Sequence, residues 1–343
     1  MRGLAVREWR DLYFLDREAK SAQRPFQPFR RPRINPFIKQ SSLPAEIKLA
    51  ATMRCLAEGG FQRSIGKDLH IALHRSTISK VLKEMLNILE RTQCPKWIKL
   101  RMSFDEIRQS KLYFSNNFNI PGVIGCIDGT HVKLLKPNDN DHLYYNRKGC
   151  FSVNAMIICD YRMIIRAVDA CHPGSSHDSF IFNQSNAKHY LESKYGAGDH
   201  SSWLLGDSGY GLEPFLLTPY RDPSAGTSEH VFNLQHAKAR NIIERVIGVL
   251  KSRFKCLQQI LPYTPQKVVQ IVNICSALHN ICRYHNIDDV LVNCTEDITD
   301  DEPAEQNSRF LTSAAHIRDE ISLEDLCRAA LGSKWTCIII LYL

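Results

Sequence analysis

Apolar residues recur with a helical period over residues 44–92. The spacing is clearest over residues 77–90, where apolar positions lie three or four apart, at Ile78, Val81, Leu82, Met85 and Leu89. This spacing predicts a helix over 77–90, with Ser76 as its N-cap. We expect two helices before it, over 44–58 and 61–70, the first ended by Gly59 and Gly60.

The last two of these helices, joined by a short link, have the layout of a helix-turn-helix. In that motif the first residues of the second helix meet base edges in the major groove of DNA. The chain is therefore predicted to carry a helix-turn-helix module over residues 43–92, with DNA contacts from Arg75, Thr77, Ser79, Lys80 and Lys83. A purely structural three-helix module is the alternative.

Between residues 121 and 210 the pattern changes to short apolar runs, which favour strands. We expect strands over 123–135, 151–159, 163–170 and 203–205, with a helix over 178–193 between the third and fourth. This order predicts a mixed α/β sheet. A loop rich in proline and glycine follows over 211–233, and long helices are expected over 235–257 and 266–286.

Charge is distributed unevenly along the 343 residues. The net charge is +8, but residues 288–325 hold twelve acids and two bases, so the rest of the chain carries +18. Such a body suits a polyanionic partner, because phosphates neutralised by basic side chains release their counterions. Residues 1–42 are interpreted as a flexible basic arm, with a DNA-contacting or nuclear-import segment as the alternative. Residues 287–343 are predicted to be an acidic linker and tail.

The twelve cysteines are scattered, and no two have the spacing of a CxxC pair. This distribution indicates a reducing compartment and argues against a disulfide framework. The start of the chain has no apolar segment typical of a signal peptide, so we expect none. The apolar run over 337–343 is shorter than the roughly 20 residues that a membrane helix needs.

Two acids occupy unusual places in the predicted strands. Asp128 lies inside VIGCIDGTHVKLL, where an acid is disfavoured and the strand pattern resumes directly after it. A turn through Asp-Gly is the alternative. Asp207 ends the strand in WLLGD, and the carboxyl ends of strands are where α/β sheets bind ligands. Its alternative is a turn begun by Asp before Ser-Gly.

Glu244 is the one acid of the predicted helix over 235–257, among the bases Lys238, Arg240, Arg245, Lys251, Arg253 and Lys255. It lies one position from the apolar stripe, at the border of the buried face. It either forms i,i+4 ion pairs or binds a metal in a basic groove that holds DNA. Divalent cations such as Mg²⁺ or Mn²⁺ take oxygen ligands, so Asp128, Asp207 and Glu244 are candidate metal ligands.

Long motifs follow one another in a fixed order over residues 121–285: DGTHV, YYNRKG, SVNAMIICD, HPGSSHDSFIF, WLLGDSGYGLEPFLLTPY and ARNIIERVIGVLKSRFKCL. This series resembles the DDE domain of PIF/Harbinger-type transposases and the harbinger transposase-derived nuclease family. The resemblance implies a DDE superfamily endonuclease domain over residues 121–286. It also implies an RNase H-like fold, in which helices flank a mixed five-stranded sheet, preceded by the all-α N-terminal module.

The same resemblance implies roles for the acids. Asp128, Asp207 and Glu244 would be the catalytic set of a divalent-metal-dependent nuclease that hydrolyses DNA phosphodiester bonds by two-metal in-line attack. Asp178, which follows His177 at the start of the predicted helix over 178–193, becomes a fourth metal ligand, with a helix cap as its alternative. The competing hypothesis is a domesticated DNA-binding regulator that keeps the fold without catalysis.

Further DNA contacts and partners complete the expectation. Arg147 and Lys148 lie in the turn NRKG, which is interpreted either as a solvated turn or as a phosphate contact. Arg240 and Lys251 flank Glu244 on its helix and would line the same groove. A Myb-like DNA-binding partner and a location in the nucleus, and also in the cytoplasm, are implied by the family resemblance alone.

Overall fold

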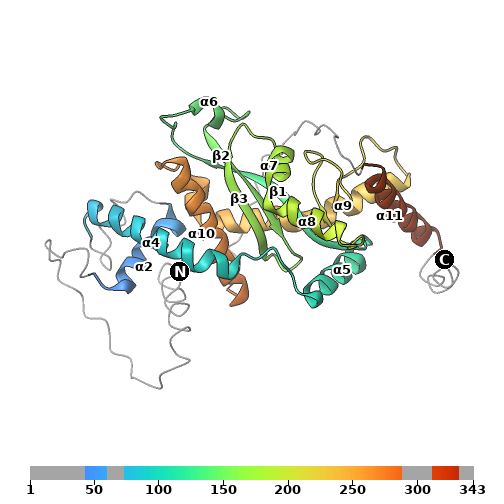
Figure 1. Ribbon diagram of the computed structural model, residues 1–343, viewed down its shortest axis with the longest axis horizontal. Helices are drawn as coiled ribbons and strands as arrows, with labels where there is room; N and C mark the ends of the chain where they lie inside the picture. The colour runs from blue at the N-terminus through green and yellow to red at the C-terminus, as the bar shows by residue number, and fades with distance from the viewer. Residues whose placement is uncertain (1–42, 60–72, 288–310, 332–343) are drawn as a thin grey trace, which may run out of the picture. The chain divides into compact units, whose positions relative to one another are not determined.

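The structure, a computed structural model, describes residues 43–59, 73–287 and 311–331 (Figure 1). The chain divides into two compact units, residues 1–87 and residues 88–343. The predicted basic arm and the predicted helix over 61–70 lie outside the described residues. So do 288–310 and 332–343 of the predicted acidic linker and tail. In the part of the chain that is described, no helix combines the length and apolar character needed to cross a bilayer.

The first unit contains helix α2 (Ala45–Glu58) and the start of helix α4 (Arg75–Trp97). α2 ends at Gly59, whose φ of 64° is a left-handed conformation that glycine adopts without strain. The prediction that Ser76 caps α4 is wrong. The helix begins at Arg75, and the backbone carbonyl of His74 accepts from the N–H groups of Thr77 and Ile78.

Small apolar clusters hold α2 against α4 in this unit. Ala51 packs on Ile78, and Leu43 packs on Val81 and Met85. The Lys48 Nζ lies 2.8 Å from the Glu84 Oε1 and adds an ion pair between the helices. Of the predicted DNA-contacting side chains, Thr77 is half-buried and the others are exposed, namely Arg75, Ser79, Lys80 and Lys83.

A five-stranded mixed sheet in the order β3-β2-β1-β4-β5 organises the second unit. Its strands are β1 (Val123–Lys133), β2 (Ser152–Cys159), β3 (Ile165–Pro173), β4 (Trp203–Leu205) and β5 (Leu216–Leu217). β1, β2 and β3 pair antiparallel, whereas β4 runs parallel to β1 and β5 runs parallel to β4. This order and polarity agree with the predicted RNase H-like fold. β5 lies inside the stretch predicted as a loop, because two residues are too few to show a period.

Helices cover both faces of the sheet (Figure 1). On one face, α7 (Asp178–Gln184) and α8 (Asn186–Gly196) pack on Ile127 and Met156. On the other face lies α9 (Ser228–Arg253), where the Cys126 Sγ–H donates to the Ala239 carbonyl at 3.7 Å. Successive side chains of a strand point to opposite faces, so Ile127 and Cys126 tie β1 to both layers.

The remaining helices of this unit are α5 (Phe104–Phe118), α6 (Asp141–Tyr144), η2 (Lys255–Gln258), α10 (Pro265–Tyr284) and α11 (Leu311–Leu331). α5 is absent from the predicted elements, although its capping box between Ser103 and Glu106 is a recognisable signal. The predicted helix over 178–193 is in fact two helices. They are separated at Ser185, whose side chain accepts from the Lys188 N–H and caps α8.

A buried ion-pair network fixes the turn between β2 and β3. The Arg166 Nη2 lies 2.6 Å from the Asp160 Oδ2 and 2.7 Å from the Glu106 Oε1 on α5. Burial alone would raise the pKa of Glu106, but the hydrogen bond from the Ser103 backbone and the pairing with Arg166 lower it to about 2. Asn280 on α10 adds hydrogen bonds to both backbone groups of Ile165. The hairpin of β2 and β3 is therefore anchored to α5 and α10.

Candidate metal centre

Asp128 lies in the middle of an uninterrupted strand. β1 pairs with β2 in continuous register through this point, Asp128 opposite Ile157 and Gly129 opposite Met156. The alternative of a turn through Asp-Gly is therefore wrong. The Gly129 N–H donates to the Asp128 Oδ1 at 2.8 Å and fixes the orientation of the carboxylate.

Asp207 lies just beyond the end of the parallel strand β4, separated from Leu205 by Gly206. Its Oδ1 accepts from the Gly209 N–H at 3.0 Å, and its carbonyl accepts from the Tyr210 N–H. The turn that was the alternative interpretation of this acid is present. The turn is compatible with a metal-binding role for Asp207, because it places the carboxylate just beyond the end of the strand.

Asp178 is the first residue of α7, and its carboxylate does not cap the helix. The N-cap is His177, and no side-chain cap hydrogen bond is present there, so the helix-cap alternative is wrong. Asn154 on β2 donates from Nδ2 to the Asp178 Oδ1 at 2.7 Å and to the Ser176 carbonyl at 3.1 Å. A Cβ on Gly129 would overlap the Asp178 carboxylate. Asn154 and Gly129 thus position Asp178, and neither was predicted as a site residue.

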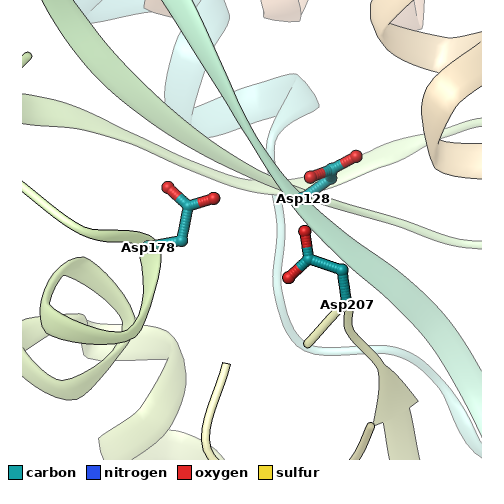
Figure 2. A group of neighbouring side chains, drawn as sticks. All are labelled: Asp128, Asp178 and Asp207. Atoms are coloured by element: carbon teal, nitrogen blue, oxygen red, sulfur yellow. The ribbon is translucent and has the colours of Figure 1, made fainter. Parts of the chain in front are cut away.

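These three aspartates converge on one point. Each offers a carboxylate oxygen, and the three oxygens lie within 4.8 Å of one another. Figure 2 shows the side chains pointing toward a common centre: Asp128 from β1, Asp207 from the end of β4, and Asp178 from the start of α7. The geometry therefore brings together three of the four predicted metal ligands.

The electrostatics of the cluster call for a cation. Burial, together with the charges of Asp207 and Asp178, raises the pKa of Asp128 to about 7, against the opposing effect of Arg240. Two buried polar atoms nearby lack a hydrogen-bond partner among the described residues, the Tyr210 hydroxyl and the Asn154 Oδ1. An all-oxygen donor set with unused polar atoms beside it suits a hydrated divalent cation, which keeps several of its waters. The residues present therefore fit Mg²⁺ or Mn²⁺.

Glu244 lies outside this cluster. The Arg240 Nη2 is 2.8 Å from the Asp128 Oδ2, and the Arg240 Nη1 is 3.7 Å from the Glu244 Oε1. The ion pair that was the alternative interpretation of Glu244 is thus present, and it connects Glu244 to Asp128 through Arg240. Arg240 itself, predicted to contact DNA, is 14% exposed and directed at the acids.

The other predicted DNA contacts of this unit are Arg147, Lys148 and Lys251. Arg147 and Lys148 are exposed on a turn held by Asn146, whose Oδ1 accepts from the Lys148 N–H. The Arg147 Nη2 contacts the ring of His177, which precedes Asp178. Burial, together with the positive charges of Lys251 and Lys148, lowers the pKa of His131 on β1 to about 4. Both lysines therefore lie within electrostatic reach of the strand that carries Asp128.

Residues 127–280 match a protein family described as DDE superfamily endonuclease. The protein named "Putative nuclease HARBI1" is 32% identical over 257 residues in Bos taurus, covering 74% of this chain and 71% of that protein. The chain belongs to the Harbinger transposase-derived nuclease family. The predicted resemblance is confirmed, and the family match begins next to Asp128 and includes all four predicted ligands.

Proteins of other organisms also match. The protein of Homo sapiens with the same name is 32% identical over an equal span, 74% of this chain and 71% of that protein. "Protein ALP1-like" of Arabidopsis thaliana is 23% identical over 291 residues, 80% of this chain and 68% of that protein. No solved structure matches the chain significantly.

The close approach of Asp178 to Gly129 leads to a first prediction. Gly129→Ala should push the Asp178 carboxylate out of the cluster and weaken Mn²⁺ binding by roughly 10- to 100-fold, as loss of outer-shell support does elsewhere. Isothermal titration calorimetry measures the affinity. Gly196→Ala is the matched control, because its added Cβ meets nothing within 4 Å. Equal Mn²⁺ affinities for the two variants would contradict the geometry.

A second prediction concerns pH. The folded state raises the pKa of Asp128 from 3.8 to about 7, so it binds more protons than the unfolded chain between these values. In the presence of EDTA, this residue's contribution to the free energy of unfolding should decline from about pH 4 to pH 7 and then level off. Mn²⁺ affinity should rise as the pH increases toward about 7, because the metal has to displace the proton from the Asp128 carboxyl group.

Thermal unfolding of wild type and Asp128→Asn at several pH values, with and without Mn²⁺, isolates this contribution. The stability difference between the two proteins in EDTA should change with pH only below about 7. A difference that is constant from pH 4 to pH 8 would show that Asp128 titrates as an ordinary surface acid.

Proposed function

We propose that this chain is a divalent-metal-dependent endonuclease that hydrolyses DNA phosphodiester bonds. The observation that carries the proposal is the convergence of Asp128, Asp178 and Asp207 within 4.8 Å, in a family described as endonucleases. Mg²⁺ or Mn²⁺ bound by these acids would polarise the scissile phosphate and lower the pKa of an attacking water, in a two-metal arrangement.

Each residue of the site has a separate task in this proposal. Asp128, Asp178 and Asp207 hold the cations. Asn154 orients Asp178 through its 2.7 Å hydrogen bond, and Gly129 leaves the space that Asp178 occupies. The attacking oxygen comes from water, so no side chain has to form a covalent intermediate. Fixed acid positions matter because in-line attack tolerates little displacement of the reacting atoms.

Basic side chains around the cluster support a nucleic-acid substrate. The positive charges of Lys148 and Lys251 help to lower the pKa of His131. The Arg147 side chain contacts His177, which precedes Asp178. The positive charge of these three basic side chains would offset the repulsion between the acidic centre and a polyanion. We therefore propose that Arg147, Lys148 and Lys251 contact the phosphates that flank the scissile bond, where they fix the register of DNA.

Nicking of supercoiled plasmid by the purified chain tests the proposal. With Mn²⁺ the wild type should convert supercoiled to open-circular DNA, and Asp128→Ala, Asp178→Ala and Asp207→Ala should each lose at least about 100-fold of the rate. Asp105→Ala, which removes an acid that is 76% exposed on α5, should behave as wild type. DNA binding without nicking by the wild type would favour the alternative, a regulator that keeps the fold.

The helix-turn-helix module is a separate proposal with its own test. Arg75, Lys80 and Lys83 are exposed along the first turns of α4. Replacing all three with Gln should weaken DNA binding and make the plot of log affinity against log salt less steep, by about 0.9 for each phosphate that is no longer neutralised. Fluorescence anisotropy at several salt concentrations measures both quantities. An unchanged affinity and slope would leave α4 with a purely structural role.

Two further proposals follow from the family resemblance. We propose that the chain acts in the nucleus, and also in the cytoplasm, and that it works with a Myb-like DNA-binding partner. Imaging of a tagged chain tests the first, with exclusion from nuclei as the contrary result. Co-purification with a Myb-like protein tests the second, and absence of any such protein from the purified complex would contradict it.

A further inference from the structure

Arg240 occupies the place next to the acid cluster where a cation is needed. Its Nη2 lies 2.8 Å from the Asp128 Oδ2, while the Asp128 Oδ1 is already bonded to the Gly129 N–H of its own strand. Oδ2, the oxygen that has no bond to its own strand, is thus the one that Arg240 holds. A metal that binds Asp128 through this oxygen has to share it with a guanidinium group or displace that group.

Sharing is unfavourable for electrostatic reasons. The Arg240 side chain is 14% exposed, so the charge of a divalent cation beside it would be poorly screened. The Arg240 Nε is buried and has no hydrogen-bond partner among the described residues. The guanidinium is therefore held on one side by carboxylates and is not locked by a complete set of hydrogen bonds. A side chain held in this way is able to move when the charge that attracts it is neutralised.

Glu244 completes the arrangement. It lies one helical turn after Arg240 on α9, with its Oε1 3.7 Å from the Arg240 Nη1, and its side chain is 37% exposed. The guanidinium bridges Glu244 and Asp128 through its two terminal nitrogens, and Glu244 is paired with Arg240 and is not part of the acid cluster. Arg240 and Glu244 share one face of α9, the face that is turned toward Asp128.

We propose that Arg240 is an exchangeable counter-cation of the site. In the metal-free protein it neutralises Asp128 and keeps Glu244 outside the cluster, as in this structure. Binding of a divalent cation displaces Arg240 from the Asp128 Oδ2, and Glu244 then turns in as an additional ligand. Arg240 is a positioning residue that acts through Asp128 and Glu244. The inference deepens the proposed function and rests on it.

The test compares Mn²⁺ binding by the full chain with Arg240 altered. Calorimetry at pH 8 would be carried out on wild type, Arg240→Met, Arg240→Lys and the control Lys238→Gln, which removes one exposed charge from the same helix. Arg240→Met should bind Mn²⁺ more tightly by on the order of tenfold, because no cation has to leave. Lys238→Gln and Arg240→Lys should stay within about threefold of wild type.

Thermal unfolding supplies a second readout. In EDTA, Arg240→Met should unfold at a lower temperature than wild type, because Asp128 loses its counter-charge. Saturating Mn²⁺ should reduce this difference in unfolding temperature, since the bound metal then neutralises Asp128. Weaker or unchanged Mn²⁺ binding by Arg240→Met, a temperature difference that widens with Mn²⁺, or equal tightening by Lys238→Gln would each overturn the exchange.

A measurement on the unaltered protein guards against a variant that fails to fold. Side-chain NMR of ¹⁵N-labelled arginine, with the Arg240→Lys spectrum for assignment, reports the Arg240 guanidinium directly. Saturating Mg²⁺ should shift its signals and release their restricted rotation; signals that do not change would overturn the proposal. Failure of the wild type to bind either metal would refute both this inference and the proposed function. Normal wild-type binding without the Arg240 effects would refute the exchange alone.

Discussion

Mutual repulsion among three aspartates is the constraint around which the second unit is arranged. Their oxygens lie within 4.8 Å, and burial together with the neighbouring charges keeps the pKa of Asp128 near 7. Each carboxylate is held against this repulsion by a specific donor: the Gly129 N–H for Asp128, the Gly209 N–H for Asp207, and Asn154 for Asp178. The sheet and α7 serve to keep those donors in place, and a divalent cation would add attraction to that of Arg240 for Asp128.

The sequence was informative wherever a pattern is local. The strand β4 was predicted at its observed bounds, and Asp128 was recognised because the alternation of apolar residues continues past it. The long apolar runs were likewise enough to predict a mixed sheet. Shorter pieces were not predictable: β5 has two residues, and the break between α7 and α8 depends on one capping serine.

Parts of the site could not be predicted because they depend on contacts across the sheet. Asn154 looks like an ordinary strand residue, and its role appears only when β2 pairs with β1 so that it lies opposite His131. Gly129 matters because of what approaches it from α7. Glu244 was correctly placed near the buried border of its helix, but a helical period gives no information on side-chain conformation. Its pairing with Arg240 depends on the conformations of both side chains.

The acid cluster joins two parts of the sheet that differ in how much backbone pairing supports them. Asp128 belongs to a strand paired with β2 at eight consecutive positions, whereas Asp207 follows a strand of three residues beside an edge strand of two. Local unfolding begins where the fewest hydrogen bonds have to break, so the β4–β5 part should open first. Such an opening would dismantle the cluster while β1, β2 and β3 stay folded. A ligand that bridges both parts would couple them, and amide hydrogen exchange in β4 and β5 would then report occupancy of the site.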